Sequence, residues 1–144
     1  MTNERTITAL TEAIQDEYKA LATYQKVIEK FGPVRPFVNI VEAEARHALA
    51  LHRQFDRLGV EPPVNDWAGR VKAPDSLLQA CEDAVAGELD NAAMYDRLLG
   101  QIDDPAVRHV LRNLQDASQN RHLQAFKQCV AREKRHAGMS AIAD

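Results

Sequence analysis

The spacing of apolar residues is the feature of this sequence that most constrains its fold. Between breaks at glycine and proline, apolar side chains recur every three or four residues rather than at every second position. A period near 3.6 residues is typical of an amphipathic helix, whereas a period of two would indicate a strand. The chain is therefore expected to be all-helical.

Local start and stop signals divide this pattern into four predicted helices, over about residues 6–31, 36–58, 76–102 and 105–135. Gly32-Pro33 and Gly59 end the first two, because glycine adopts the left-handed conformation that closes a helix and proline cannot continue one. Asp104-Pro105 is a start signal, since aspartate can cap the first turn and proline fits the first helical position. Residues 137–144 are expected to form a loose tail.

The lengths of the connections predict how the helices are arranged. Short connections make an antiparallel hairpin of the first pair and another of the second pair. Gly59 to Pro74 is longer and can span about 50 Å, whereas a helix over residues 36–58 is about 35 Å long. We therefore expect one domain, residues 1–144, folded as a four-helix bundle with a long crossover between helices 2 and 3. Trp67 is expected to pack this crossover onto the bundle surface.

An internal repeat adds polar residues to the apolar faces of both hairpins. Glu17 and Glu88 each lie on such a face, and each precedes a tyrosine, Tyr24 or Tyr95, by seven residues. Seven residues are two helical turns, so each glutamate shares a face with its tyrosine. The tyrosines are interpreted as packing residues, with a hydroxyl that reaches a carboxylate as the alternative.

The second helix of each hairpin carries a histidine on its apolar face. His47 follows Glu44 by three residues, and His122 has the equivalent place in the last helix. An unpaired carboxylate in an apolar interior costs several kcal/mol, and a bound cation would remove that cost. Glu-x-x-His supplies one oxygen and one nitrogen from the same helical face.

Five side chains are therefore predicted to converge on a metal site: Glu17, Glu44, His47, Glu88 and His122. Their oxygen and nitrogen donors suit iron or manganese, and zinc can also enter. The alternative is a metal-free bundle in which the same side chains form a buried polar network. Polar residues off the apolar faces are expected at the surface, namely Asp16, Glu42, Asp90, His52, His109 and His136.

With these residues, the chain resembles the ferritin-like superfamily of carboxylate-bridged di-metal proteins over about residues 6–133. It is more similar to rubrerythrin-type and uncharacterised bacterial ferritin-like domains than to ferritin itself. The resemblance implies an all-α, ferritin-like antiparallel four-helix bundle with one long crossover. It also implies one or two iron ions that support ferrous oxidation, dioxygen or peroxide reduction, or substrate oxidation.

Two positions depart from the family pattern. Gln119 stands where the second Glu-x-x-His would have its glutamate, and Asn91 stands where rubrerythrin-like chains have a further carboxylate, one turn after Glu88. With two divalent ions, the three remaining carboxylates leave the site with one net positive charge. With a single divalent ion, they leave one net negative charge, so both stoichiometries stay open. The Gln119 side chain is expected to face the cavity between His122 and Glu88.

The function expected from these residues is iron handling or redox chemistry with oxygen or peroxide. The alternative is a ferritin-like interaction or structural module without metal, and a third reading is a single zinc or manganese ion that only stabilises the fold. The chain lacks a Cys-x-x-Cys electron-transfer motif, so electrons are expected from an external donor.

Charge and hydropathy narrow the expected partners and location. A net charge of −3 argues against binding nucleic acid by neutralising phosphates. No apolar run is long enough to span a membrane, and the first residues lack the apolar segment of a secretory signal. A cytoplasmic location is expected, while a removed export signal and a homodimer stay open.

The two cysteines are expected to be neighbours. Cys81 lies seven residues before Glu88, and Cys129 lies seven residues after His122. In an antiparallel hairpin both offsets lead the same way, so the thiols should share a layer about two turns from the metal site. The favoured interpretation is a pair of buried reduced thiols, and the alternative is a redox-sensitive disulfide.

Overall fold

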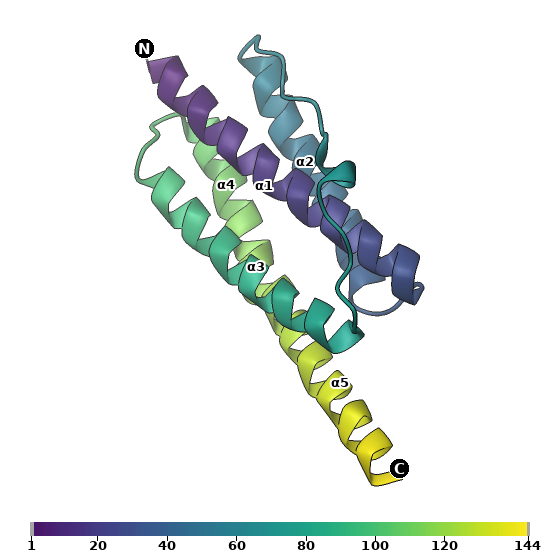
Figure 1. The fold of residues 1–144 in the computed structure, drawn as a ribbon. Coiled ribbons are helices and arrows are strands. Elements are labelled where there is room, and N and C mark those ends of the chain that lie inside the picture. The colour runs from purple at the N-terminus through teal and green to yellow at the C-terminus, as the bar shows by residue number, and fades with distance from the viewer. Residues whose placement is uncertain (1, 144) are drawn as a thin grey trace.

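A computed structural model describes the backbone of residues 2–143 and the side chains of residues 4–138. Over this range the chain is helical and has no strand (Figure 1). The α-helices are α1 (Thr2–Phe31), α2 (Phe37–Arg57), α3 (Leu77–Leu99), α4 (Pro105–Ala117) and α5 (Leu123–Ala143). A π-helix, η2 (Ser118–His122), continues α4 into α5, and a short 3₁₀ turn, η1 (Trp67–Gly69), lies between α2 and α3.

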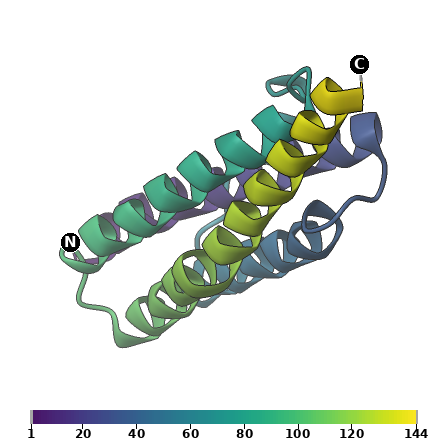
Figure 2. The same cartoon turned by 90° about the horizontal axis from the view of Figure 1, so that it is seen from below.

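The helices pack as an antiparallel bundle of two hairpins (Figures 1 and 2). α1 pairs with α2, and α3 pairs with the continuous rod of α4, η2 and α5. Residues 58–76 lead from the end of α2 to the start of α3 at the opposite end of the bundle, passing beside α1 (Figure 1). No helix among the described residues is long and apolar enough to cross a membrane.

Trp67 holds this long connection against α1, as its sequence context predicts. Its indole N–H donates to Gln15 Oε1 at 2.7 Å, and its ring packs partly buried against the apolar core. The guanidinium of Arg70 lies 3.8 Å from the centre of the ring. A second tie comes from Tyr18, whose hydroxyl donates to the carbonyl of Pro63 at 3.1 Å. The connection is thus fixed along the bundle rather than free.

The predicted start and stop signals lie at the ends of helices in the structure. Gly32 and Gly59 both have positive φ, 91° and 71°, where a β-carbon would be strained. The Asp104 side chain accepts a hydrogen bond from the Val107 N–H at 3.1 Å and so caps α4. The ends differ at three places. α1 begins at Thr2 instead of about residue 6. α3 stops at Leu99 because Gly100 follows, and the last helix continues to Ala143 instead of ending in a loose tail.

The longer last helix has a simple physical reason. No proline follows Arg135, and several of the last residues are alanines, which favour helix. The predicted tail over residues 137–144 is therefore wrong as far as Ala143, and Asp144 lies outside the described residues.

Buried apolar residues form two clusters, one toward each end of the bundle. The first includes Leu10, Leu51, Tyr95 and Leu111, and the second includes Tyr24, Phe37, Ala80 and Phe126. On α2, α3 and the α4–α5 rod, the predicted ligand residues lie in sequence between the members of the two clusters. The core therefore has a polar layer in the middle of the bundle, with apolar packing on either side.

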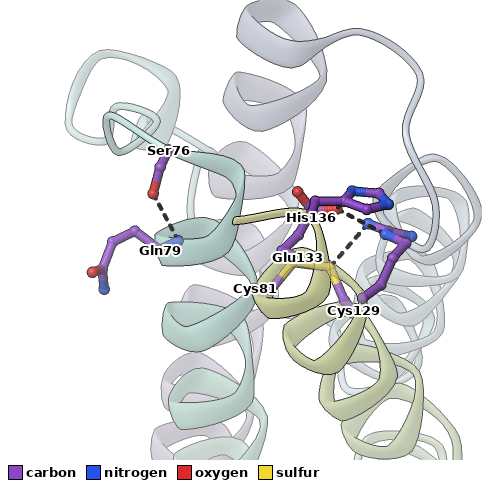
Figure 3. The surroundings of a disulfide bond; sticks show 7 residues. Ser76, Gln79, Cys81, Cys129, Glu133 and His136 are labelled. Carbon is purple, nitrogen blue, oxygen red and sulfur yellow. Dashed lines mark hydrogen bonds and ion pairs between the residues drawn. A yellow bond between two sulfur atoms is a disulfide. The ribbon is translucent and has the colours of Figure 1, made fainter. Parts of the chain in front are cut away.

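Cys81 of α3 and Cys129 of α5 are joined by a disulfide within the second cluster (Figure 3). Their Cα atoms are 5.7 Å apart, which confirms that they are neighbours. The favoured interpretation as reduced thiols is wrong in this structure. The equal seven-residue offsets bring the two side chains to one level of an antiparallel pair, at a Cα separation that a disulfide can bridge.

Reduction of this disulfide is expected to destabilise the bundle. The bridge spans a sequence separation of 48 residues, and closing a loop of this size contributes about 4 kcal/mol of stability in the chain-entropy model. A reductant should then lower the melting temperature of the protein by about 10 °C.

The double variant Cys81→Ala/Cys129→Ala is the matched control for this measurement. It should melt near the reduced parent and respond to neither oxidant nor reductant. A parent protein whose fully reduced form melts at the same temperature as its oxidised form would contradict the expectation.

Candidate metal centre

Each side of the bundle contributes side chains to the polar layer. The structure brings together all five predicted ligand residues: Glu17 of α1, Glu44 and His47 of α2, Glu88 of α3 and His122 of η2. The three carboxylate residues are at most 3% exposed and His122 is 5% exposed. His47 is half-buried at the edge of the layer. Ionisable side chains are thus concentrated in a largely buried layer.

The five residues form two groups of three that share Glu44. One group is Glu17, Glu44 and His47, and the other is Glu44, Glu88 and His122. Within each group, one potential donor atom per residue lies within 4.8 Å of the others. Each group is therefore compact enough to surround a cation.

Distances place Glu44 Oε1 between the two imidazoles. It lies 3.8 Å from His47 Nδ1 and 3.0 Å from His122 Nδ1. The outer carboxylates complete the groups, with Glu17 Oε2 3.6 Å from His47 Nδ1 and Glu88 Oε1 3.5 Å from His122 Nδ1. The two imidazole rings are stacked with their centres 5.5 Å apart. Glu44 can therefore contribute to both groups at once.

Four atoms of this layer are buried without a hydrogen-bond partner among the described residues. They are Glu17 Oε2, Glu44 Oε1, His47 Nδ1 and His122 Nδ1. A buried polar atom left unpaired costs about 1–3 kcal/mol, so proteins rarely leave several in one place. All four are lone-pair donors suited to a cation, which fits the donor set predicted from the sequence.

Two tyrosines tie the outer glutamates across the bundle. Tyr95 donates to Glu17 Oε1 at 2.6 Å, and Tyr24 donates to Glu88 Oε1 at 2.9 Å. Each tyrosine thus reaches the glutamate of the other hairpin, so the alternative to a pure packing role is confirmed. Burial and the nearby carboxylates raise the pKa of both hydroxyls well above the ordinary value, which keeps them protonated as donors.

The carboxylates of Glu17 and Glu44 titrate as a coupled pair. Burial and the charge of Glu17 raise the pKa of Glu44 well above its ordinary value. Burial also acts to raise the pKa of Glu17, but the neighbouring side chains of Glu44 and His47 outweigh it and lower that pKa. Without a cation, the proton of the pair therefore resides on Glu44.

The π-helix corrects the predicted position of the missing carboxylate. Gln119 is exposed, so the prediction that it faces the cavity is wrong. A π turn holds more residues than an α turn, so Ser118, four residues before His122, lies inside instead. Ser118 is 1% exposed and donates to Asn91 Oδ1 at 2.5 Å. The four-residue spacing of Leu114, Ser118 and His122 is the sequence signal that places Ser118 on the inner face.

Asn91 connects Ser118 to the carboxylate of Asp16, which the sequence predicts at the surface. The Asn91 amide donates to Asp16 Oδ2, and Asp16 is half-buried. Burial raises the pKa of Asp16 to about 6, against the opposing effect of the Asn91 hydrogen bond. The prediction for Asp16 is therefore wrong, because its partner comes from a different helix.

The other polar residues off the apolar faces lie largely as predicted. Four of them are exposed, Glu42, Asp90, His109 and His136, and His52 is half-buried. None of the five belongs to either group of ligand-type residues among the described part of the chain.

A cavity of about 340 Å³ between α1 and α3 connects the layer to solvent. Its inner wall includes Glu44 and Glu88, and its outer part includes Asp16, Asp83 and Asp90. The small residues Ala20 and Gly87 also line it, where larger side chains would narrow the opening. Ions and small molecules can therefore approach the carboxylates from this side.

Comparison with known proteins supports the fold. No family model matches the chain, and no curated protein matches it. In structure it is similar to a hypothetical protein, MJ0754 from Methanococcus jannaschii DSM 2661, with a TM-score of 0.79 and 20% sequence identity. The match covers 89% of this chain and 81% of that one. At this identity, the likeness shows a shared helical-bundle fold and nothing of the function.

Removal of the Tyr95 hydroxyl is expected to destabilise the protein, because the polar layer depends on the hydrogen bond from Tyr95 to Glu17. Tyr95→Phe leaves Glu17 Oε1 buried and unpaired, which should lower the free energy of unfolding by about 1–3 kcal/mol. Tyr18→Phe is the matched control, because that hydroxyl binds only the part-buried carbonyl of Pro63. Denaturant unfolding measures both, and an equal or larger loss in Tyr18→Phe would refute the expectation.

Proposed function

We propose that this chain is a ferritin-like metal-binding protein whose bundle core holds one or two iron ions, with manganese or zinc as alternatives. The ligands are Glu17, Glu44, His47, Glu88 and His122. The observation that carries the proposal is the set of four buried donor atoms without a hydrogen-bond partner. A cation is the simplest partner that would satisfy all four at once.

The composition and sharing of the donor set support iron or manganese. Carboxylate oxygens are hard ligands and imidazole nitrogens are intermediate ones, and the site has three of the first and two of the second. Soft thiolate ligands are not among them, since both cysteines are in the disulfide. Glu44 is common to both groups, which is how a carboxylate bridges two ions in ferritin-like proteins. The tyrosine hydroxyls hold the outer oxygens of Glu17 and Glu88 and so fix the orientation of these ligands.

Charge balance supports the same assignment. Two divalent ions against the three buried carboxylates leave one net positive charge. Asp16 lies at the edge of the layer, hydrogen-bonded to Asn91, and its carboxylate interacts electrostatically with Glu17 and Glu88. It can supply the missing negative charge without acting as a ligand. A single ion is balanced nearly as well without it.

The activity proposed for this site is iron handling or redox chemistry with oxygen or peroxide. Bound iron would supply the electron exchange with the oxidant. The protein contributes a layer shielded by apolar clusters on both sides, protonated tyrosines and an opening between α1 and α3. Electrons would come from an external donor.

A metal-free structural or interaction module is the second candidate. The observation that favours it is the raised pKa of Glu44, since a proton on this carboxyl would partly replace a cation beside Glu17. In that case the layer is a buried hydrogen-bonded network. Metal content separates the two candidates directly.

Glu44→Gln is the first test, because Glu44 belongs to both groups of ligands. Protein purified without chelator should contain one or two metal ions per chain by elemental analysis, and the variant should contain none. The metal-free variant should melt near the temperature of the metal-free parent, because Glu44 is protonated there and glutamine replaces one neutral polar side chain with another.

Glu42→Gln is the matched control, with the same chemical change at an exposed position of the same helix. It should keep the metal content of the parent. Equal metal content in the Glu44 and Glu42 variants, or a parent that binds no metal when offered ferrous, manganous and zinc ions, would refute the proposal.

Ser118→Asp tests the position of the missing carboxylate. Ser118 is buried beside Asn91, so an aspartate there adds negative charge next to the His122 group and should increase occupancy of a second ion. Gln119→Asp adds the same charge at an exposed position and should leave the stoichiometry unchanged. If Gln119→Asp rather than Ser118→Asp raises the metal content, the register given by the π-helix is wrong.

A further inference from the structure

A second cavity of about 500 Å³ lies between the start of α2 and the rod formed by η2 and α5. It shares no lining residue with the cavity between α1 and α3. Its lining contains no aspartate or glutamate but four arginines, namely Arg35, Arg121, Arg132 and Arg135. His122 and Cys129, both buried, also line it.

The concentration of positive charge is unusual for this chain, which carries a net charge of −3. The cavity between α1 and α3 has the opposite character, because its charged residues are mostly carboxylates. The two openings therefore attract ligands of opposite sign. Cations are favoured at the first, and anions at the second.

Three of the four arginines are free to bind a ligand. Arg132 pairs with Glu133 at 2.8 Å, and its Nη2 lies 3.4 Å from Cys129 Sγ. Arg35, Arg121 and Arg135 have no ion pair or hydrogen bond with any described residue. Their guanidinium donors are thus unsatisfied except by solvent.

The start of α2 adds to the positive potential of the same cavity. Pro36 and Asn39, from the boundary and first turn of α2, line the cavity. This helix has no side-chain cap and no acidic residue in its first turn. The N–H groups of Val38 and Asn39 already donate to the carbonyls of Val34 and Pro36, so the start of α2 contributes its partial positive charge to the cavity rather than free donors.

We propose that this cavity binds a small multivalent oxyanion, a molecule that carries phosphate or several carboxylates. Guanidinium groups bind such groups through paired, charge-assisted hydrogen bonds. The volume lies in the range of small-molecule sites and exceeds the need of a single phosphate ion. A bound anion would lie beside His122, at the edge of the polar layer. The anion site stands on its own residues and does not depend on a metal.

The test uses isothermal titration calorimetry with two probes, inorganic phosphate and tricarballylate, a tricarboxylate. The parent should bind at least one of them saturably. Arg121→Gln/Arg135→Gln should weaken that binding about tenfold or more, the effect of losing one to two charge-assisted hydrogen bonds. Arg35→Gln/Arg135→Gln is a second variant that leaves the π-helix unchanged.

Arg46→Gln/Arg112→Gln is the matched control. Both arginines are exposed, lie outside the cavity and have no partner among the described residues. This variant removes as many positive charges as each of the cavity variants, so the net charge of the protein changes equally. Binding should change by less than about twofold, as expected for screened charges at a distance. An equal loss in this control would overturn the proposal, because the attraction would then be nonspecific. Absence of saturable binding of both probes to the parent would also overturn it.

Glu44→Gln separates this proposal from the metal site. If phosphate or tricarballylate binds to a metal ion in the polar layer, Glu44→Gln will abolish binding while the arginine variants retain it, and the anion site is refuted. If the arginine variants lose binding and Glu44→Gln retains it, the anion site is supported even where no metal is found.

Discussion

A layer of carboxylates and imidazoles enclosed by apolar packing is the constraint on which the rest of this structure depends. Glu17 and Glu44 are almost completely buried, between one apolar cluster around Leu51 and another around Phe126. Such groups are stable there only if hydrogen bonds, shared protons or a cation compensate for the lost water. The Tyr95 hydroxyl satisfies one oxygen of Glu17, and a bound cation would compensate for the four buried atoms of the layer that have no hydrogen-bond partner.

Much of this arrangement follows from the sequence because it depends on spacing within single helices. The three-to-four-residue period predicts the bundle, and the three-residue step from Glu44 to His47 puts both on one face. The repeat of Glu17 as Glu88 predicts that both hairpins contribute at similar depth. These relations survive folding because an α-helix fixes side-chain directions locally. The crossover after Gly59 is likewise predicted from the sequence, because the number of residues in the connection is enough to span the length of a helix.

The features that the sequence did not reveal depend on contacts between helices. The π-helix leaves Gln119 exposed, and the hydroxyl of Ser118 donates to Asn91 of α3. Asp16 is half-buried because of a contact between helices as well, since it accepts a hydrogen bond from the Asn91 amide of α3. The seven-residue offset predicted that Tyr95 shares a face with Glu88, whereas its hydroxyl reaches Glu17 of the other hairpin. A single helix carries no information about such partners.

Anomalous X-ray diffraction at the iron edge, from crystals grown with ferrous iron under anaerobic conditions, tests the central claim most directly. The account predicts anomalous density within the polar layer, in contact with Glu44 and at least one of the two histidines. Two ions would give one peak beside Glu17 and His47 and another beside Glu88 and His122. An anomalous map without a peak in this layer, from crystals in which Glu17 Oε2 and Glu44 Oε1 share a proton or contact only water, would contradict it.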